Sequence, residues 1–128
     1  MNSRHLSRQQ AIQLLYNVEF TQITLDEAVK SIENLTDDAK LFAKEVLNNL
    51  PEIDEIISAS LVNYTLNRLN AVDRAILRLA TYELKNNGPK AVVINDALEL
   101  TKEFSDTGDK KAVRFNNRLL DTIASKLN

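Results

Sequence analysis

Apolar residues recur every three or four positions along most of the chain, a spacing that places them on one face of an α-helix. The strongest run covers residues 66–84, where Val72, Ile76 and Leu79 follow one stripe. Four apolar residues after Lys90 would also suit a strand, but the apolar positions that follow them keep helical spacing, so we expect a helix there. The expected helices cover approximately residues 7–19, 24–35, 36–50, 51–61, 66–84, 90–104 and 110–127.

Residues that begin and end helices stand between these runs. Thr24 and Glu27 have the spacing of a capping box, and Asn70 suits the N-cap of the central helix. Gly88, which is followed by a proline, is expected to end that helix. The pattern therefore predicts an all-α fold, a compact bundle of six to seven helices formed by residues 1–128 as a single domain.

The composition adds little to this picture of the fold, but it argues against several classes of function. With 128 residues, 44% of them hydrophobic, the chain can bury an ordinary core without a metal or a disulfide. It has no cysteine, its single histidine is His5, and Gly88 and Gly108 stand too far apart for a phosphate-binding glycine loop. We therefore expect no enzyme activity, no cofactor and no metal. Because no stretch approaches the ~20 apolar residues of a membrane span, we expect a cytoplasmic protein without a membrane partner.

Charge is distributed unevenly along the chain, although its net value is only −2. Residues 1–18 hold two arginines, the histidine and no acid, and residues 110–128 hold five bases against one acid. Residues 19–109 hold 17 acids against 9 bases, a net charge of −8. Such segregation can produce an anion-attracting face on an acidic body, or simply an uneven solvated surface. Charge alone does not decide between the two.

The last helix carries a basic stripe with an aromatic residue at its border. On a helical projection Lys111, Arg114 and Arg118 share one stripe, and Phe115 falls between that stripe and the apolar side. An aromatic ring beside cations can stack on an unpaired base while the cations hold phosphates. The alternative is that the ring packs inward and the stripe is merely solvated.

Two asparagines follow Phe115. Asn116 projects into the middle of the apolar side, where an unpaired amide would be costly, and Asn117 projects to its opposite border. Either the Asn116 amide bonds to a neighbouring backbone group, or the helix begins later and Asn116 lies near its cap.

A short basic arm opens the chain. Arg4, His5 and Arg8 precede the first apolar stripe, and Arg4 and Arg8 are one helical step apart if the first helix extends back to them. Together with the basic stripe of the last helix, this arm would form a bipartite anion site, provided that the two ends of the chain meet in space.

Four segments, in chain order, resemble one known family. They are a basic opening helix at 4–16, the run VDRAILRLATYEL at 72–84, the run VINDALEL at 93–100 after Pro89, and RFNNRLLD at 114–121. The last of these resembles the closing motif FVNGxLD of the NusB transcription-antitermination family. The match spans nearly the whole chain, and its central run is the most specific part.

The resemblance implies a fold of two packed helical subdomains. It also implies binding of boxA-type single-stranded RNA from ribosomal-RNA leaders together with NusE, a ribosomal protein, within the RNA polymerase antitermination complex. The partner is expected near Asp73, which aligns with an acidic family residue, although Asp73 could equally be a helix-start carboxylate and Glu83 a structural partner of a nearby arginine. The RNA-binding residues expected from the basic ends and the resemblance together are Arg4, His5, Arg8, Lys111, Arg114, Phe115, Asn117 and Arg118.

The chain departs from the family pattern at both ends. Leu6 and Ser7 interrupt the arginines of the basic arm, Asn116 replaces the usual valine, and Arg118 replaces the usual glycine. These changes bear on RNA affinity and sequence preference more than on the fold. They leave two rival interpretations, a protein–protein interaction module with weak or lost RNA binding, and a NusB-like domain of an RNA methyltransferase.

Overall fold

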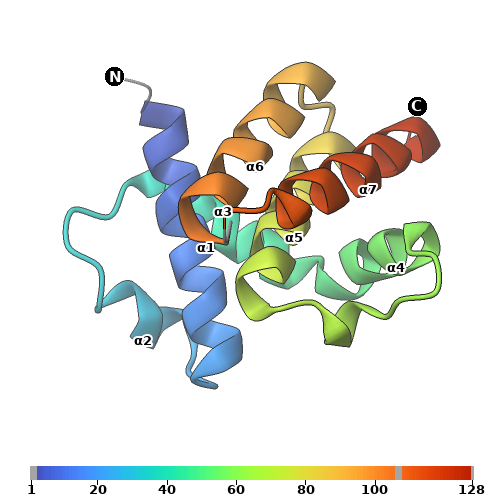
Figure 1. Ribbon diagram of the computed structural model, residues 1–128. Coiled ribbons are helices and arrows are strands. Elements are labelled where there is room, and N and C mark those ends of the chain that lie inside the picture. Colours follow the sequence, from blue (N-terminus) through green and yellow to red (C-terminus); the bar gives the residue numbers. More distant parts are fainter. Residues whose placement is uncertain (1–2, 106–107, 128) are drawn as a thin grey trace.

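The computed structural model describes residues 3–105 and 108–127, and within them every regular element is helical (Figure 1). The all-α prediction is therefore confirmed, with seven α-helices in this part of the chain. The elements are α1 Ser3–Phe20, α2 Leu25–Val29, α3 Asp37–Asn48, α4 Leu50–Ser60, the 3-10 turn η1 Leu66–Arg68, α5 Ala71–Lys85, α6 Lys90–Phe104 and α7 Lys111–Leu127.

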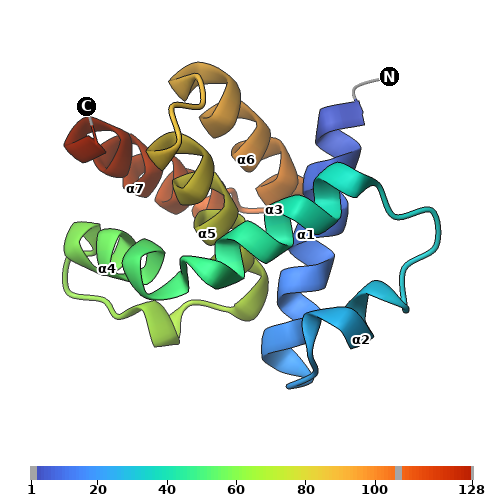
Figure 2. The same ribbon diagram turned by 180° about the vertical axis from the view of Figure 1, so that it is seen from behind.

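Helix α5 lies at the centre of the molecule. Helices α1, α2 and α3 pack on one another on one side of it, and α4, α6 and α7 pack against its other sides (Figures 1 and 2). This arrangement agrees with the expected pair of packed helical groups. In both views the start of α1 and the end of α7 lie on opposite sides of the molecule.

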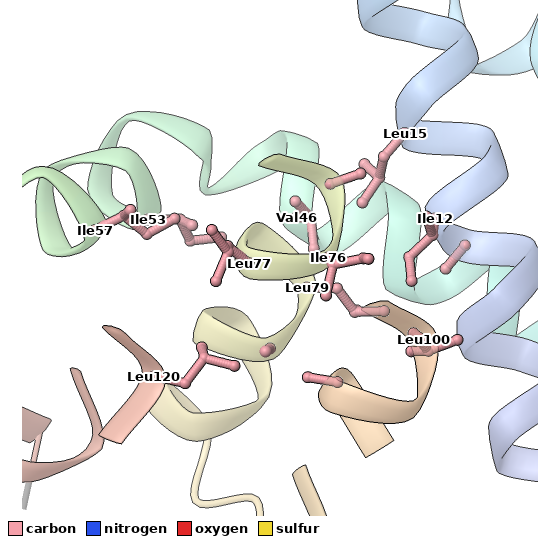
Figure 3. Close-up of a cluster of buried hydrophobic side chains, with 14 of the residues drawn as sticks. Ile12, Leu15, Val46, Ile53, Ile57, Ile76, Leu77, Leu79, Leu100 and Leu120 are labelled. Carbon is pink, nitrogen blue, oxygen red and sulfur yellow. The ribbon is translucent and has the colours of Figure 1, made fainter. Parts of the chain in front are cut away.

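One buried apolar cluster joins the two groups. Figure 3 shows side chains of α1, α3, α4, α6 and α7 gathered around those of α5, among them Leu15 of α1, Ile53 of α4 and Leu120 of α7. Leu77 at the middle of α5 is completely buried. Burying a leucine or isoleucine of this kind contributes about 1.5–3 kcal/mol, so the cluster accounts for the association of short helices that would not be stable alone.

Most helix ends follow the predicted signals, with three exceptions. Helix α1 begins at Ser3, earlier than predicted, and residues 66–70 of the predicted central helix are not α-helical, since residues 66–68 form η1 and Asn70 caps α5. The third exception is α2. The Thr24 hydroxyl accepts the backbone N–H of Glu27 in a complete capping box, and Asn70 Oδ1 accepts the N–H of Asp73 at 2.8 Å. The helix predicted over 24–35, however, ends at Val29. The reason is a contact outside the segment.

That contact is made by the buried side chain of Gln10 in α1. Its Nε2 donates to the carbonyl of Asn34 at 3.0 Å, and its Oε1 accepts the N–H of Thr36 at 2.9 Å. These bonds hold the turns between Val29 and Thr36, and the hydroxyl of Thr36 caps α3. The apolar residues of this stretch, Ile32 and Leu35, still pack against the core.

Two further boundaries bear on the site. Helix α1 begins at Ser3, which places Arg4 and Arg8 one helical step apart. The loop predicted over 105–109 lies partly outside the described residues. In the part of the chain that the structure describes, no helix combines the length and the apolar character needed to cross a bilayer.

Candidate nucleic-acid interface

Phe115 lies on the surface at the start of α7. Its side chain is 39% exposed, and its ring meets that of Tyr64 with centroids 5.7 Å apart and planes inclined by 59°. The guanidinium of Arg68 lies over the other ring of the pair, 4.9 Å from the centroid of Tyr64. The ring of Phe115 is therefore part of an exposed aromatic and cationic surface and does not enter the core.

Two hollows adjoin this ring, each of about 350 Å³. The first lies between the segment before α5 and the start of α7, and its lining includes Tyr64, Arg68 and Lys111. The second lies between the end of α4 and α7, and its lining includes Val62 and Arg118. Phe115 lines both hollows and so forms the wall between them.

The predicted basic stripe of α7 faces solvent. Lys111, Arg114 and Arg118 are all exposed, as is Asn117 beside them. Among these, the ammonium of Lys111 lies 4.0 Å from the carboxylate of Asp109, an exposed contact of little energetic weight. The stripe therefore offers cationic groups next to an exposed ring.

The sequence left two alternatives for Asn116, a bond to a neighbouring backbone group or a position near the cap of the helix, and the structure shows neither. Asn116 is completely buried inside α7, and its amide nitrogen donates to Thr101 Oγ1 at 3.1 Å and to Asp73 Oδ1 at 3.4 Å. Its partners are thus side chains of α5 and α6, and Asn116 is neither near a cap nor bonded to a neighbouring backbone group. The amide ties the start of α7 to the two helices beneath it.

Asp73 lies in the first turn of α5 and is 8% exposed. Its second carboxylate oxygen accepts Asn70 Nδ2 at 2.9 Å, so both oxygens are bonded within the protein. It lines the first hollow together with Lys111 and Phe115. Asp73, which was expected at a partner surface, therefore lies beneath the expected RNA surface. Its position in the first turn of α5 is that of a helix-start carboxylate, the other alternative.

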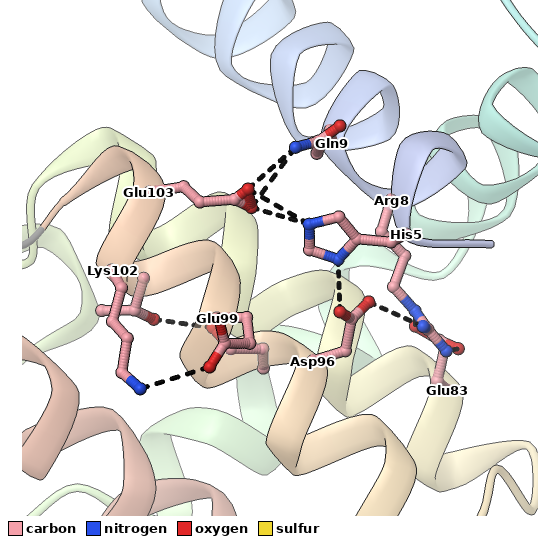
Figure 4. Close-up of polar contacts among 10 residues, drawn as sticks. His5, Arg8, Gln9, Glu83, Asp96, Glu99, Lys102 and Glu103 are labelled. Atoms are coloured by element: carbon pink, nitrogen blue, oxygen red, sulfur yellow. Dashed lines mark hydrogen bonds and ion pairs between the residues drawn. The ribbon is translucent and has the colours of Figure 1, made fainter. Parts of the chain in front are cut away.

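Arg8 is buried, contrary to the expectation that it contacts phosphate. It is 4% exposed, its Nε and Nη2 bond the two carboxylate oxygens of Glu83 at 2.8 and 2.7 Å, and its Nη1 bonds Asp96 at 2.7 Å (Figure 4). Burial alone would lower the pKa of Arg8, but the hydrogen bonds and charges of Glu83 and Asp96 raise it. The guanidinium joins α1 to α5 and α6, and Glu83 is the structural partner of an arginine, as one alternative proposed.

His5 also joins α1 to α6. Its Nδ1 bonds Asp96, and its Nε2 bonds Glu103 at 2.7 Å (Figure 4). Burial alone lowers the pKa of His5, but hydrogen bonds and charges from Asp96 and Glu103 raise it above its ordinary value. Arg4, the residue before His5, is exposed, and its guanidinium lies over the ring of Phe42, 5.4 Å from the ring centroid. The N-terminal arm therefore packs against α3 and α6, whereas Phe115 packs against Tyr64. Because the two basic ends of the chain contact different elements, we treat them as two separate surfaces.

The bridge between His5 and α6 predicts a pH dependence of stability. Because the folded pKa is above the unfolded value of about 6.5, the protonated bridge stabilises the fold fully below that value and is lost as pH rises through the folded pKa. Thermal unfolding midpoints measured from about pH 6 to pH 9 should therefore fall more steeply for the native chain than for His5→Gln. Parallel curves for the two proteins would contradict the bridge.

The segment between α4 and α5 was not singled out from the sequence. It carries Tyr64 and Arg68, and Arg74 of α5 holds it by donating to the backbone carbonyls of Asn67 and Leu69. The guanidinium of Arg74 also bonds Glu19 of α1 at 2.7 Å. The aromatic and basic residues of this segment, spaced one helical turn apart, were the available signal, but nothing in their spacing linked them to α7.

A third hollow, of about 170 Å³, lies where α1, α5 and α6 meet, and its lining is mostly apolar. Tyr16, Val72 and Phe104 contribute to it. Beside it Phe20, which stacks on Tyr16 with centroids 5.1 Å apart, is 65% exposed, and Phe104 is 48% exposed. We call this the Tyr16 surface. Exposed aromatic residues gathered around an apolar hollow are typical of a protein–protein contact.

The fold and the exposed ring beside the basic stripe of α7 define a small all-helical protein with a candidate nucleic-acid surface. The family model described as the NusB family matches residues 5–125, and the chain belongs to that family. The transcription antitermination protein NusB of Bacillus subtilis is 39% identical over 132 residues, covering 97% of this chain and 96% of that protein.

Solved structures agree with this assignment. T. maritima NusB superposes with a TM-score of 0.84 at 32% identity, covering 96% of this chain and 91% of that one. A structure of the antitermination factors NusB and NusE in complex with dsRNA superposes with a TM-score of 0.79 at 29% identity, covering 98% of both chains. The fold inferred from the four sequence segments is therefore that of the family.

Proposed function

We propose that this chain is a non-enzymatic antitermination factor that binds boxA-type single-stranded RNA in ribosomal-RNA leaders together with NusE, as part of the RNA polymerase antitermination complex. The observation that carries the proposal is the exposed ring of Phe115 at the border of the cationic stripe Lys111, Arg114 and Arg118. A ring of this kind stacks on an unpaired base, while the cations hold the adjoining phosphates.

The proposed contacts differ from the sequence-based set in one respect. Arg8 is left out, because all of its contacts serve the ion pairs with Glu83 and Asp96. Arg4, His5 and Asn117 stay as proposed contacts, with Arg4 offering an exposed guanidinium at the start of α1. Because Arg4 and His5 lie on α1 and contact α3 and α6, we infer that the N-terminal arm meets a different part of the RNA from the part that meets α7.

For NusE we propose the Tyr16 surface. It lies at the start of α5, next to the expected position of the partner, and presents exposed apolar groups that a protein partner would cover. A related NusB was solved with NusE and double-stranded RNA, which supports the same pair of ligand classes here. The choice of a single strand rests on the exposed ring, since the faces of a base inside a duplex are covered by its stacked neighbours, whereas an unstacked base of a single strand offers a free face.

The proposal predicts that NusE strengthens RNA binding. The body of the chain is acidic, so the chain alone should bind a boxA oligonucleotide weakly, and a saturating amount of NusE should tighten the dissociation constant by about tenfold or more. Fluorescence anisotropy of a labelled oligonucleotide, titrated with the chain in the presence and absence of NusE, measures both constants.

A matched pair of variants gives this titration its control. Tyr16→Ala should weaken NusE binding and the gain in RNA affinity, whereas Leu41→Ala, which alters an exposed apolar residue of α3, should leave both unchanged. Equal RNA affinity with and without NusE would reject the cooperative model.

The two rival interpretations make different predictions for the same assay. A pure protein–protein module would bind NusE but no RNA, or would bind RNA without dependence on salt. The methyltransferase-domain alternative has less support, because relatives that the chain matches, such as the B. subtilis NusB at 39% identity, are transcription antitermination proteins.

A further inference from the structure

We propose that the two hollows beside Phe115 hold two successive nucleotides of a single RNA strand, and that Tyr64 and Arg68 are RNA-binding residues. The inference rests on the proposed function and adds to it the path of the strand, which would cross α7 at Phe115 and pass over the segment between α4 and α5.

The shape of the site supports two places for bases. Phe115 lines both hollows, and each hollow measures about 350 Å³. The rings of Tyr64 and Phe115 are inclined by 59°, so they meet as a corner and do not cover each other's faces as a parallel stack would. One base fits the corner made by the two rings, and the next fits the apolar hollow beyond Phe115, where Val62 is 81% exposed.

The charges around the hollows suit a polyanion. Arg68 and Lys111 line the first hollow, and Arg118 lines the second. The acid among the residues lining the first hollow is Asp73, whose carboxylate oxygens are both bonded to asparagine side chains. Each hollow thus combines a surface for a flat ring with a cation for a phosphate, which is the repeating unit of a nucleic acid strand.

The segment that carries the added residues is held in place before any ligand binds. The Tyr64 hydroxyl donates to the carbonyl of Arg68 at 3.2 Å, and the Arg68 guanidinium lies over the Tyr64 ring. Arg74 ties the same segment to α5 through the carbonyls of Asn67 and Leu69. A preorganised surface avoids the entropy cost of ordering a loop on binding, so both hollows are available to the free protein.

Single-stranded RNA suits this arrangement better than a protein segment does. An amphipathic helix needs one continuous apolar groove, whereas here the wall formed by Phe115 divides the surface into two hollows, each with its own cation. A strand of nucleotides can place one base on each side of such a wall while its backbone passes over the top.

Variants of the full chain test the site in RNA titrations carried out without NusE. Tyr64→Ala and Phe115→Ala should each weaken binding of a boxA oligonucleotide on the order of tenfold. Tyr64→Phe, which keeps the ring, should retain binding to within about twofold on the same stacking argument. Leu41→Ala on α3 is the control, and circular dichroism establishes that each variant is folded.

Crosslinking then locates the bases. Oligonucleotides with a single 5-iodouridine at successive positions are irradiated on the native chain, and the crosslinked residues are mapped by mass spectrometry. We expect one position to crosslink to Tyr64 and its immediate neighbour in the RNA to Val62 or Phe115.

The outcomes separate this inference from the proposed function. RNA binding that survives Tyr64→Ala unchanged, with crosslinks on α7 and none on residues 61–68, would overturn the two-nucleotide site and leave the proposed function standing. A Tyr64→Ala chain that loses NusE but keeps RNA would show a protein-docking surface and overturn the site as well. A native chain that binds no RNA, with or without NusE, would reject both.

Discussion

Replacing Arg8 by methionine is expected to lower the free energy of unfolding by about 3–5 kcal/mol. The substitution keeps much of the apolar stem but leaves the carboxylate of Glu83, whose side chain is 6% exposed, without its cation, and leaves Asp96 with His5 alone. A buried ion pair contributes little net stability as a pair, but removing one member leaves an uncompensated charge that cannot be solvated. Urea unfolding followed by circular dichroism measures the loss.

Two companion variants make this result specific. Arg114→Met removes an exposed arginine from α7 and should change stability by about 0.5 kcal/mol or less. Adding Glu83→Gln to Arg8→Met should recover part of the loss, because it removes the carboxylate charge that has lost its cation. If Arg8→Met were as stable as Arg114→Met, the buried ion pairs would not contribute to the fold as described.

The second large effect is expected for Asn116→Asp. It places a carboxylate at a completely buried position, beside Asp73 and in contact distance of Thr101, and should destabilise the chain on the order of 3 kcal/mol at neutral pH. Because protonation removes the buried charge, the loss should shrink as pH falls. Unfolding curves at pH 7 and at about pH 5 measure both quantities.

Asn116→Val is the matched control for that measurement. Valine is the residue at this position in the family motif that the sequence resembles, and it removes the amide that donates to Thr101 and Asp73 without adding a charge. The expected cost is about 1–2 kcal/mol, because two hydrogen bonds are lost, one of them long. Equal losses for the valine and aspartate variants would mean that shape, and not charge, governs this position.

These two positions also change how the ends of the chain are interpreted. A loss of RNA binding in an Arg8 variant would follow from unfolding or from movement of α1, since Arg8 bonds α5 and α6. Exposed cations such as Arg114 and Arg118 are the better test of phosphate contacts. Salt dependence should fall when they are removed, while stability should not.

Local signals predicted most of the helical structure. Helix α6 and the end of α7 agree with the predicted segments, and the caps at Thr24 and Asn70 are formed as expected. The helix expected over 24–35 was too long. Gln10 of α1 bonds the backbone of Asn34 and Thr36, on both sides of the predicted helix end at Leu35. A contact of that kind depends on a residue far away in sequence, and periodicity does not report it.

The candidate site was predicted unevenly for the same reason. The stripe of α7 follows from spacing within one helix, so its exposure was foreseen correctly for Lys111, Arg114 and Arg118. Tyr64 and Arg68 were missed because they reach Phe115 through folding and not through their own segment. The family resemblance pointed to the basic residues at both ends of the chain, but it did not indicate which of them are buried, as Arg8 is.

The sequence by itself therefore determined the helices, most of their boundaries and the basic, aromatic face of α7, because each depends on residues within a few positions of one another. The tertiary structure decided which charged groups remain available to a ligand. Arg8 finds Glu83 and Asp96 at separations of 75 and 88 residues, and Asn116 finds Asp73 at a separation of 43. Whether a basic residue meets phosphate or stabilises the fold is decided by such distant partners, because a charge paired inside the protein is not free to bind outside it.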